Sequence, residues 1–258
     1  MNDVPPAEEI PAATLVIFRQ ARPGPPEILM VVRSKTMSFA GGAAVFPGGR
    51  VDSEDYELAA ALDHACGDDD EAAHRIAAIR ETLEETGLAL GITEPVNGNG
   101  AAEARALALK ERALAPVLEH FGWTLKLDDL VPFARWLPRG ISHSRIFDTR
   151  FYLYDLGTGA VDIAVDRTEN TKLFWITADE ALRMADAGQI AVIFPTRRNL
   201  ERLAQFRSFA EAKRHADGIP VRPITPRMDK VDGRDALVIP GDAGYPVLHE
   251  KLDTATRG

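Results

Sequence analysis

The sequence predicts an α+β domain, and three observations support this class. Two β-rich segments, residues 12–19 and 27–33, are separated by a Gly-Pro-Pro turn, which predicts an antiparallel strand pair. A long helix is predicted from about Glu71 to Thr86, and Gly87 follows it where a left-handed C-terminal cap is favoured. Strand and helix signals both continue beyond this helix, as an α+β domain requires.

The remaining elements follow in order along the chain. Strands are predicted at residues 43–46, 130–136, 147–154 and 172–176. Helices are predicted near residues 55–66, 103–121, 178–187 and 196–216. The last forty residues contain five prolines. We therefore expect one domain over residues 1–218, followed by an extended C-terminal segment over residues 219–258.

Composition limits the classes of partner. The chain of 258 residues, 45% hydrophobic and 27% charged, has the length and composition of one enlarged globular domain. Its formal net charge is −9, so the phosphate backbone of a nucleic-acid polymer would be repelled and no such partner is expected. A small phosphorylated substrate is compatible with this charge, because a bound divalent cation reverses the local sign of an acidic pocket.

Cysteine content and hydropathy indicate the compartment. Cys66 is the only cysteine, which excludes an intrachain disulfide and a thiolate metal site built within one chain. The first eleven residues carry acids and prolines rather than a signal sequence, and no segment approaches the roughly 20 apolar residues of a membrane span. We expect a cytoplasmic protein without a membrane partner, and the sequence leaves a homodimer open.

The helix predicted at residues 71–86 has two different faces. Apolar side chains at helical spacing form one face: Ile76, Ile79 and Leu83. Carboxylates form the other: Glu81, Glu84 and Glu85. Such a charged face is ordinarily a solvated surface. However, neighbouring like charges destabilise a helix unless a cation relieves them, and Mg²⁺ binds through a few carboxylates together with substrate phosphates. Arg80, one turn before Glu84, can support such a ligand or form an ordinary surface ion pair.

Two motifs resemble the Nudix hydrolase family. Residues 80–88, RETLEETGL, match the REUXEEXGU end of the Nudix box, with Thr82 a mild departure where an aliphatic residue is usual. Residues 46–49, FPGG, match the family's entry into the box. Residues 33–49 also resemble the RSX7GX3FPGG lead-in of coenzyme A-type Nudix enzymes, with Ala43 where a glutamate often stands. The resemblance covers roughly residues 13–216.

The spacing within the box departs from the family pattern GX5EX7REUXEEXGU. The box glycine precedes the arginine by fourteen residues in the family, whereas Gly49 precedes Arg80 by thirty-one, an insertion of seventeen. Counted back from Arg80, the first glutamate falls on Ala72, so its role is vacant or filled from residues 68–71. We expect the inserted residues to form an acidic flap beside the metal site, and helix capping is the alternative role for the acids at 68–70. A long insertion here resembles the branch of the peroxisomal coenzyme A diphosphatases.

The resemblance implies a fold and a set of site residues. The implied fold is an αβα sandwich with a mixed central sheet and insertions at about residues 51–70 and 95–125. Mg²⁺ or Mn²⁺ would bind Gly49 and the three glutamates, which with Arg80 form the implied catalytic set, and the identity of the general base stays open. Substrate contacts are assigned to four residues: Arg33, Phe46, Gly48 and Arg50.

The resemblance also implies a reaction. It is hydrolysis of a diphosphate bond in a nucleoside diphosphate linked to another moiety, with coenzyme A or acyl-coenzyme A as the first choice of substrate. NADH or ADP-ribose is the alternative substrate. The alternative class is a catalytically silent Nudix domain that binds a ligand as a regulator. Loss of the box glutamates is the usual sign of that class, and this sequence retains Glu81, Glu84 and Glu85.

Overall fold

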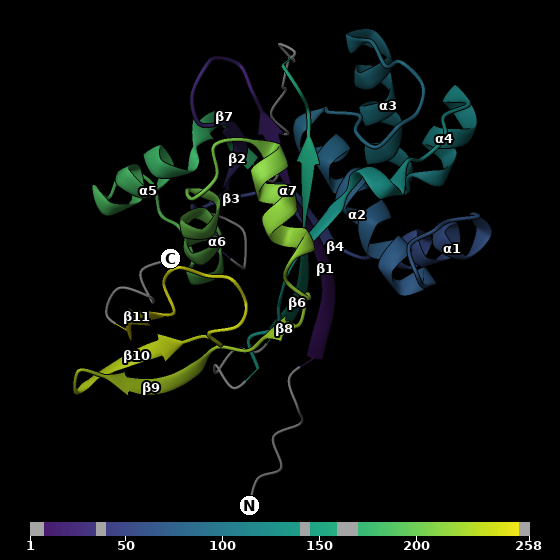
Figure 1. Cartoon of the computed structure of the whole chain (residues 1–258). Helices are drawn as coiled ribbons and strands as arrows, with labels where there is room; N and C mark the ends of the chain where they lie inside the picture. Colours follow the sequence, from purple (N-terminus) through teal and green to yellow (C-terminus); the bar gives the residue numbers. More distant parts are fainter. Residues whose placement is uncertain (1–7, 35–39, 140–144, 159–169, 253–258) are drawn as a thin grey trace, which may run out of the picture.

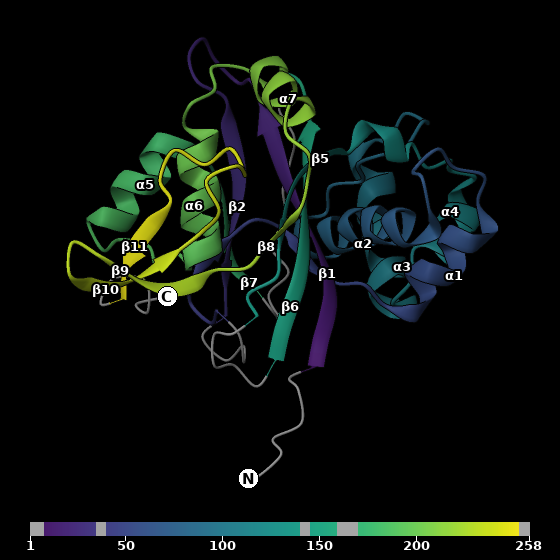
Figure 2. The same cartoon turned by 60° about the horizontal axis from the view of Figure 1, so that its bottom comes forward.

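The structure is a computed structural model and describes residues 8–34, 40–139, 145–158 and 170–252. A mixed central sheet lies between two groups of helices (Figure 1), so the predicted α+β class and sandwich are confirmed. The first group is α1 (Ser53–Ala61), α2 (Asp69–Thr86), α3 (Gly98–Glu111) and α4 (Ala115–Phe121). The second group is α5 (Ala178–Asp186), α6 (Phe194–Leu203) and α7 (Phe209–Asp217). Figure 2 shows the two groups on opposite sides of the sheet, the first in blue and the second in green.

The strand β1 is the centre of the sheet. The strands are β1 (Glu8–Arg19), β2 (Glu27–Arg33), β3 (Ala44–Val45), β4 (Gly48–Arg50), β5 (Val131–Trp136), β6 (Arg145–Asp155), β7 (Asn170–Thr177) and β8 (Pro223–Ile224). On one side β1 pairs in parallel with β6. On the other it pairs antiparallel with β4 through residues 12–14 and with β2 near its end, where Phe18 lies opposite Ile28. The antiparallel pairing of β1 and β2 was predicted. β2 also pairs with β3 and with β7.

Each face of the sheet has its own apolar core, because successive side chains of a strand point to opposite faces. On one face, Leu15 and Ile17 of β1 pack with the apolar face of α2. On the other face, Val16 and Phe18 pack with side chains that include Leu200 of α6. The long helix α2 is therefore fixed against β1. Because β4 pairs with β1, the C-terminal end of α2 is also held in place relative to β4.

The sequence predicted α2 closely. The helix begins after Asp68, whose side chain accepts a hydrogen bond from the Glu71 N–H, and it ends at Gly87, which has φ +77°. The left-handed conformation at Gly87 has little steric cost because glycine has no Cβ. The predicted packing face of Ile76, Ile79 and Leu83 is buried, with at most 1% of each residue exposed.

We predict that Leu83→Ala lowers the free energy of unfolding by about 2 to 5 kcal/mol, because it removes a buried side chain and leaves a cavity. Leu83 is 1% exposed, which makes this substitution a test of how α2 packs. Chemical denaturation of the purified variant measures the effect. Leu109→Ala is the control, since Leu109 on α3 is 45% exposed. An unfolding midpoint equal to that of the wild type would contradict the packing of α2.

Two predicted helices are each divided in the structure. The helix predicted at residues 103–121 is α3 and α4, because Arg112 adopts a left-handed conformation with φ +54° and Pro116 lies in the first turn of α4. The helix predicted at residues 196–216 is α6 and α7, because the Ser208 side chain accepts from the Glu211 N–H and begins a new helix. Within the described ranges, no helix has the length and apolarity needed to cross a membrane.

The segment after α7 contains strands that the sequence analysis did not predict. β9 (Arg227–Val231), β10 (Arg234–Val238) and β11 (His249–Lys251) form a second, three-stranded antiparallel sheet. Buried Leu237 and Tyr245 join the core beside α6, and the Tyr245 hydroxyl donates to Asn199 Oδ1 at 2.7 Å. This segment therefore completes the core on the face opposite α2.

Candidate active site

A tight turn between β3 and β4 brings the box glycines to the end of α2. The Leu15 N–H donates to the Pro47 carbonyl at 2.9 Å, and β4 then pairs with β1. Gly48 has φ +152°, and a Cβ there would lie 2.3 Å from the Ala13 carbonyl oxygen, so only glycine fits. The Gly48 N–H donates to Glu85 Oε2 at 3.0 Å. The turn and the helix are thus joined directly at a box glutamate.

Gly49 lies against the carboxylate of Glu81. A Cβ atom on Gly49 would be 2.3 Å from Glu81 Cδ and 2.5 Å from each carboxylate oxygen. The absence of a side chain at Gly49 therefore makes the space that the Glu81 carboxylate occupies. This contact brings Glu81 and Gly49, two residues of the predicted metal site, next to each other.

Arg80 is buried and holds several groups of the site together. Its guanidinium makes two hydrogen bonds with Asp55, from Nε to Oδ1 at 3.0 Å and from Nη2 to Oδ2 at 2.9 Å. It also donates to Glu81 Oε1 at 3.0 Å and to the Arg50 carbonyl at 3.0 Å, and its Nη1 lies 3.5 Å from Glu84 Oε1. Arg80 is only 2% exposed, so the surface ion pair considered from sequence is replaced by a buried network.

Asp55 corrects the assignment of the first box glutamate. Counting back from Arg80 placed that position at Ala72, but Ala72 is fully buried among apolar residues. Counting forward from Gly49 with the family's five intervening residues reaches Asp55, the acid that pairs with Arg80. The seventeen additional residues therefore lie between Asp55 and Arg80. The forward count was available from sequence and would have identified Asp55.

The acids at residues 68–71 are engaged away from the box glutamates. Asp68 caps α2, and His64 lies 3.2 Å from Asp69. Asp70 and Glu71 both form ion pairs with Arg150 of β6. Helix capping therefore accounts for Asp68, as the alternative reading held. The acid that pairs with Arg80 is therefore Asp55 on α1, which precedes the additional residues, rather than one of these acids.

The carboxylates do not form the solvent-exposed face that the helix pattern suggested. Glu85 is only 5% exposed, and the side chains of Glu81 and Glu84 are 16% and 17% exposed. The turn at Gly48 and the helix α1 cover this side of α2, which an isolated helical pattern does not reveal. Glu85 also accepts a hydrogen bond from Asn170 Nδ2 at 3.1 Å, and Asn170 of β7 was not identified from sequence.

Burial changes the acidity of two carboxylates. Burial, together with the charges of Glu85 and Glu84, raises the pKa of Glu81 to about 8, although Arg80 acts in the opposite direction. Burial likewise raises the pKa of Glu84, again against the effect of Arg80. Partly buried like charges of this kind favour a proton or a cation among them. The donor set of hard carboxylate oxygens fits Mg²⁺ or Mn²⁺.

We predict that the metal-free protein loses stability between about pH 5 and pH 8 because of Glu81. Its pKa is higher in the folded than in the unfolded chain, so the stabilisation is complete below the unfolded value near 4.5 and is lost as the pH rises towards 8. Melting temperatures of the wild type and Glu81→Gln in chelator would test this. The variant should gain stability relative to the wild type as the pH rises. Parallel curves for the two proteins would contradict the raised pKa.

The predicted substrate-contact residues are not all brought together. Gly48 lies at the carboxylates, and the Arg50 carbonyl accepts from Arg80 while the residue itself is exposed. Arg33 is opposite Asn170 in the pairing of β2 and β7, and its buried Nε has no hydrogen-bond partner among the described residues. Phe46 is 3% exposed and packs in the core on the face opposite α2, so its side chain is not at the site.

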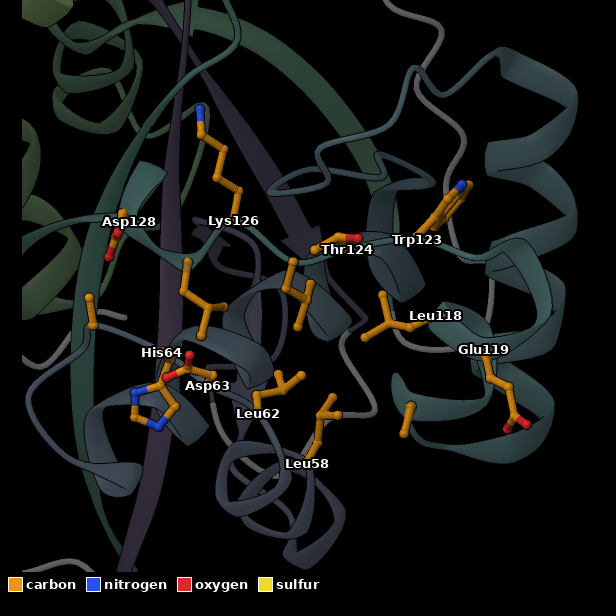
Figure 3. Close-up of a pocket in the computed structure, with 14 residues that line it drawn as sticks. Leu58, Leu62, Asp63, His64, Leu118, Glu119, Trp123, Thr124, Lys126 and Asp128 are labelled. Atoms are coloured by element: carbon orange, nitrogen blue, oxygen red, sulfur yellow. The ribbon is translucent and has the colours of Figure 1, made fainter.

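A cavity of about 740 Å³ lies between α1 and the α4 region, lined by residues of both predicted insertions (Figure 3). Its apolar side chains include five leucines and an indole: Leu58, Leu62, Leu118, Leu125, Leu127 and Trp123. Its acidic lining residues, Asp63, Glu119 and Asp128, outnumber its one lysine, Lys126. None of the predicted site residues lines this cavity. The carboxylates at the end of α2 are the better candidate site.

The carboxylates at the end of α2 suit a metal site in which water and substrate supply the remaining ligands. Within the described ranges, no three His, Cys, Asp or Glu side chains form a preassembled metal cage. Mg²⁺ commonly binds through one or two carboxylates together with waters and substrate phosphates, so such a cage is not required. Glu81 lies beside Gly49, and Arg80 Nη1 lies within 3.5 Å of both Glu81 and Glu84, so these groups are candidate protein ligands.

Comparisons with known proteins agree with the fold and the motif. No family model matches the chain. The acyl-coenzyme A diphosphatase NUDT19 of Gallus gallus is 26% identical over an aligned length of 282 residues. The match covers 85% of this chain and 73% of that protein. NUDT19 of Xenopus laevis is 26% identical over 281 residues, with 85% and 71% covered. The crystal structure of a Nudix hydrolase from Alicyclobacillus acidocaldarius has a TM-score of 0.69 and 28% identity, covering 81% of this chain and 96% of that one.

In this structure a glycine turn and an acidic helix meet beside a mixed sheet, and the turn donates a hydrogen bond to a glutamate of the helix. In fold and in the box sequence the chain is similar to the Nudix hydrolases over most of its length.

Proposed function

We propose that the chain hydrolyses a phosphoanhydride bond, using Mg²⁺ or Mn²⁺, and that its substrate is coenzyme A or an acyl-coenzyme A. One observation carries the proposal. The three box glutamates are retained, Glu81 and Glu85 lie against the Gly48–Gly49 turn, and Arg80 bonds to Glu81 and lies 3.5 Å from Glu84. A catalytically silent relative has no need to keep this arrangement.

The chain's own residues have separate tasks in this reaction. The metal would neutralise charge on the diphosphate oxygens and lower the pKa of a coordinated water. Glu81, Glu84, Glu85 and the Gly49 carbonyl would hold it. Arg80 keeps two of these carboxylates in place, and Asp55 fixes Arg80. One of the glutamates accepts the proton of the attacking water, and all three stay candidates for that role.

The choice of substrate rests on similarity. The two NUDT19 proteins, which are acyl-coenzyme A diphosphatases by name, match 85% of this chain. The lead-in motif that resembles coenzyme A-type enzymes includes Arg33, which lies opposite Asn170 near the carboxylates. A guanidinium there is suited to bind a phosphate group of the substrate.

A panel of diphosphate compounds tests both parts of the proposal. Coenzyme A, a short and a long acyl-coenzyme A, NADH and ADP-ribose would be incubated with the protein and Mg²⁺ or Mn²⁺, and the products separated chromatographically. We expect the coenzyme A compounds to be cleaved at the diphosphate with the highest kcat/KM. Preference for NADH or ADP-ribose would overturn the substrate assignment. Binding of a compound without cleavage would instead support a ligand-binding regulator.

A further inference from the structure

Asn170 is a buried side chain at the site that belongs to no Nudix-box motif. It is the first residue of β7 and is 1% exposed. Its Nδ2 donates to Glu85 Oε1 at 3.1 Å, while the Gly48 N–H donates to Glu85 Oε2. Two donors on different strands therefore hold the two oxygens of one carboxylate, which fixes the rotation of that carboxylate as well as its position.

The orientation of the Asn170 amide follows from the chemistry of its partner. An ionised carboxylate only accepts hydrogen bonds, so the NH₂ group must face Glu85. The Asn170 carbonyl oxygen then points away, and it is buried without a hydrogen-bond partner among the described residues. Buried polar atoms without a partner are uncommon in native proteins, and each calls for an explanation. An apolar residue of the same size would avoid this cost and would lose the bond to Glu85.

From this geometry we infer that Asn170 is a positioning residue, which orients the Glu85 carboxylate for the metal and leaves its own Oδ1 as an acceptor for a water or a substrate donor. The inference rests on the proposed metal-dependent function. Partners that orient a ligand commonly change metal affinity by about 10- to 100-fold when they are removed. Asn170 acts through Glu85 and is not itself a catalytic residue.

Mn²⁺ titration of the full chain, followed by calorimetry, tests the inference without relying on turnover. Asn170→Leu keeps a similar volume but has no donor, and we expect it to weaken Mn²⁺ binding by about 10- to 100-fold. Asn170→Ser, which is too short to reach Glu85, should act in the same direction and decides the matter if the leucine variant does not fold. Thr171→Val is the control, because Thr171 is the next residue of β7 and is exposed.

A second comparison separates positioning from a general structural effect. In a Glu85→Ala background, Asn170→Leu should cause no further loss of Mn²⁺ affinity, because the group that Asn170 orients is absent. Equal Mn²⁺ affinity in the wild type and both Asn170 variants would overturn the inference while leaving the proposed function intact. A further loss in the Glu85→Ala background would also overturn it. Absence of Mn²⁺ binding by the wild type would contradict the proposed function and the inference together.

Discussion

Asp55→Ala is expected to lower the free energy of unfolding by about 3 to 5 kcal/mol, the usual cost of removing one partner of a buried ion pair. Asp55 is 1% exposed and receives two hydrogen bonds from Arg80, which is itself buried. Its Oδ2 also accepts from the Asp52 N–H at the start of α1. The substitution therefore leaves a buried cation with weaker compensation and removes part of a helix cap.

The same change should reduce catalysis, because Arg80 also bonds to Glu81 and lies near Glu84. Urea denaturation measures the loss of stability, and kcat/KM with Mn²⁺ measures the loss of activity. Glu54→Gln is the matched control, since Glu54 is the preceding residue and is exposed. Asp55→Glu restores the residue of the family motif and the negative charge, so it should keep more activity than Asp55→Asn. Equal activity in those two variants would show that the charge paired with Arg80 is unimportant.

The sequence predicted the elements of the fold well where local signals are strong. The strands near residues 12–19 and 27–33 and the helix that ends at Gly87 all formed close to their predicted places. Weaker sequence signals mark the points at which the two long predicted helices are interrupted. The break at Arg112 depends on a non-glycine residue in the left-handed conformation, which residue type alone does not indicate. The strands after α7 depend on packing against α6, which lies far from β10 in sequence.

The site shows a similar division between local and long-range information. The three glutamates and Arg80 could be recognised from one helix, because their spacing is local. Asp55 was missed because the box was counted from one end only, although the insertion lies between Asp55 and Arg80. Asn170 could not be found in this way, because eighty-five residues separate it from Glu85 and only the pairing of β7 with β2 brings it there. The burial of Glu85 likewise depends on the whole sandwich.

Glu84→Gln is expected to lower kcat/KM by about 10²- to 10⁴-fold, the range that the loss of a positioned acid–base group covers. A neutral amide oxygen is also a poorer ligand for Mg²⁺ than a carboxylate, so a loss is expected whether Glu84 binds the metal or takes the proton. Glu84 is the most informative of the three positions. Its contact with Arg80 is long, at 3.5 Å, whereas Glu85 is fixed by Gly48 and Asn170 and its replacement would disturb the turn.

Stability should change in the opposite direction to activity in this variant. Burial raises the pKa of Glu84, so its ionised form is disfavoured in the metal-free protein, and a neutral glutamine removes that penalty. The melting temperature in chelator at pH 8 should therefore equal or exceed that of the wild type, while Mn²⁺ should stabilise the variant less than the wild type. Glu57→Gln on the exposed side of α1 is the control. A near-wild-type rate for Glu84→Gln would exclude Glu84 from the catalytic set, and a low rate with a strongly reduced melting temperature would assign it a structural role instead.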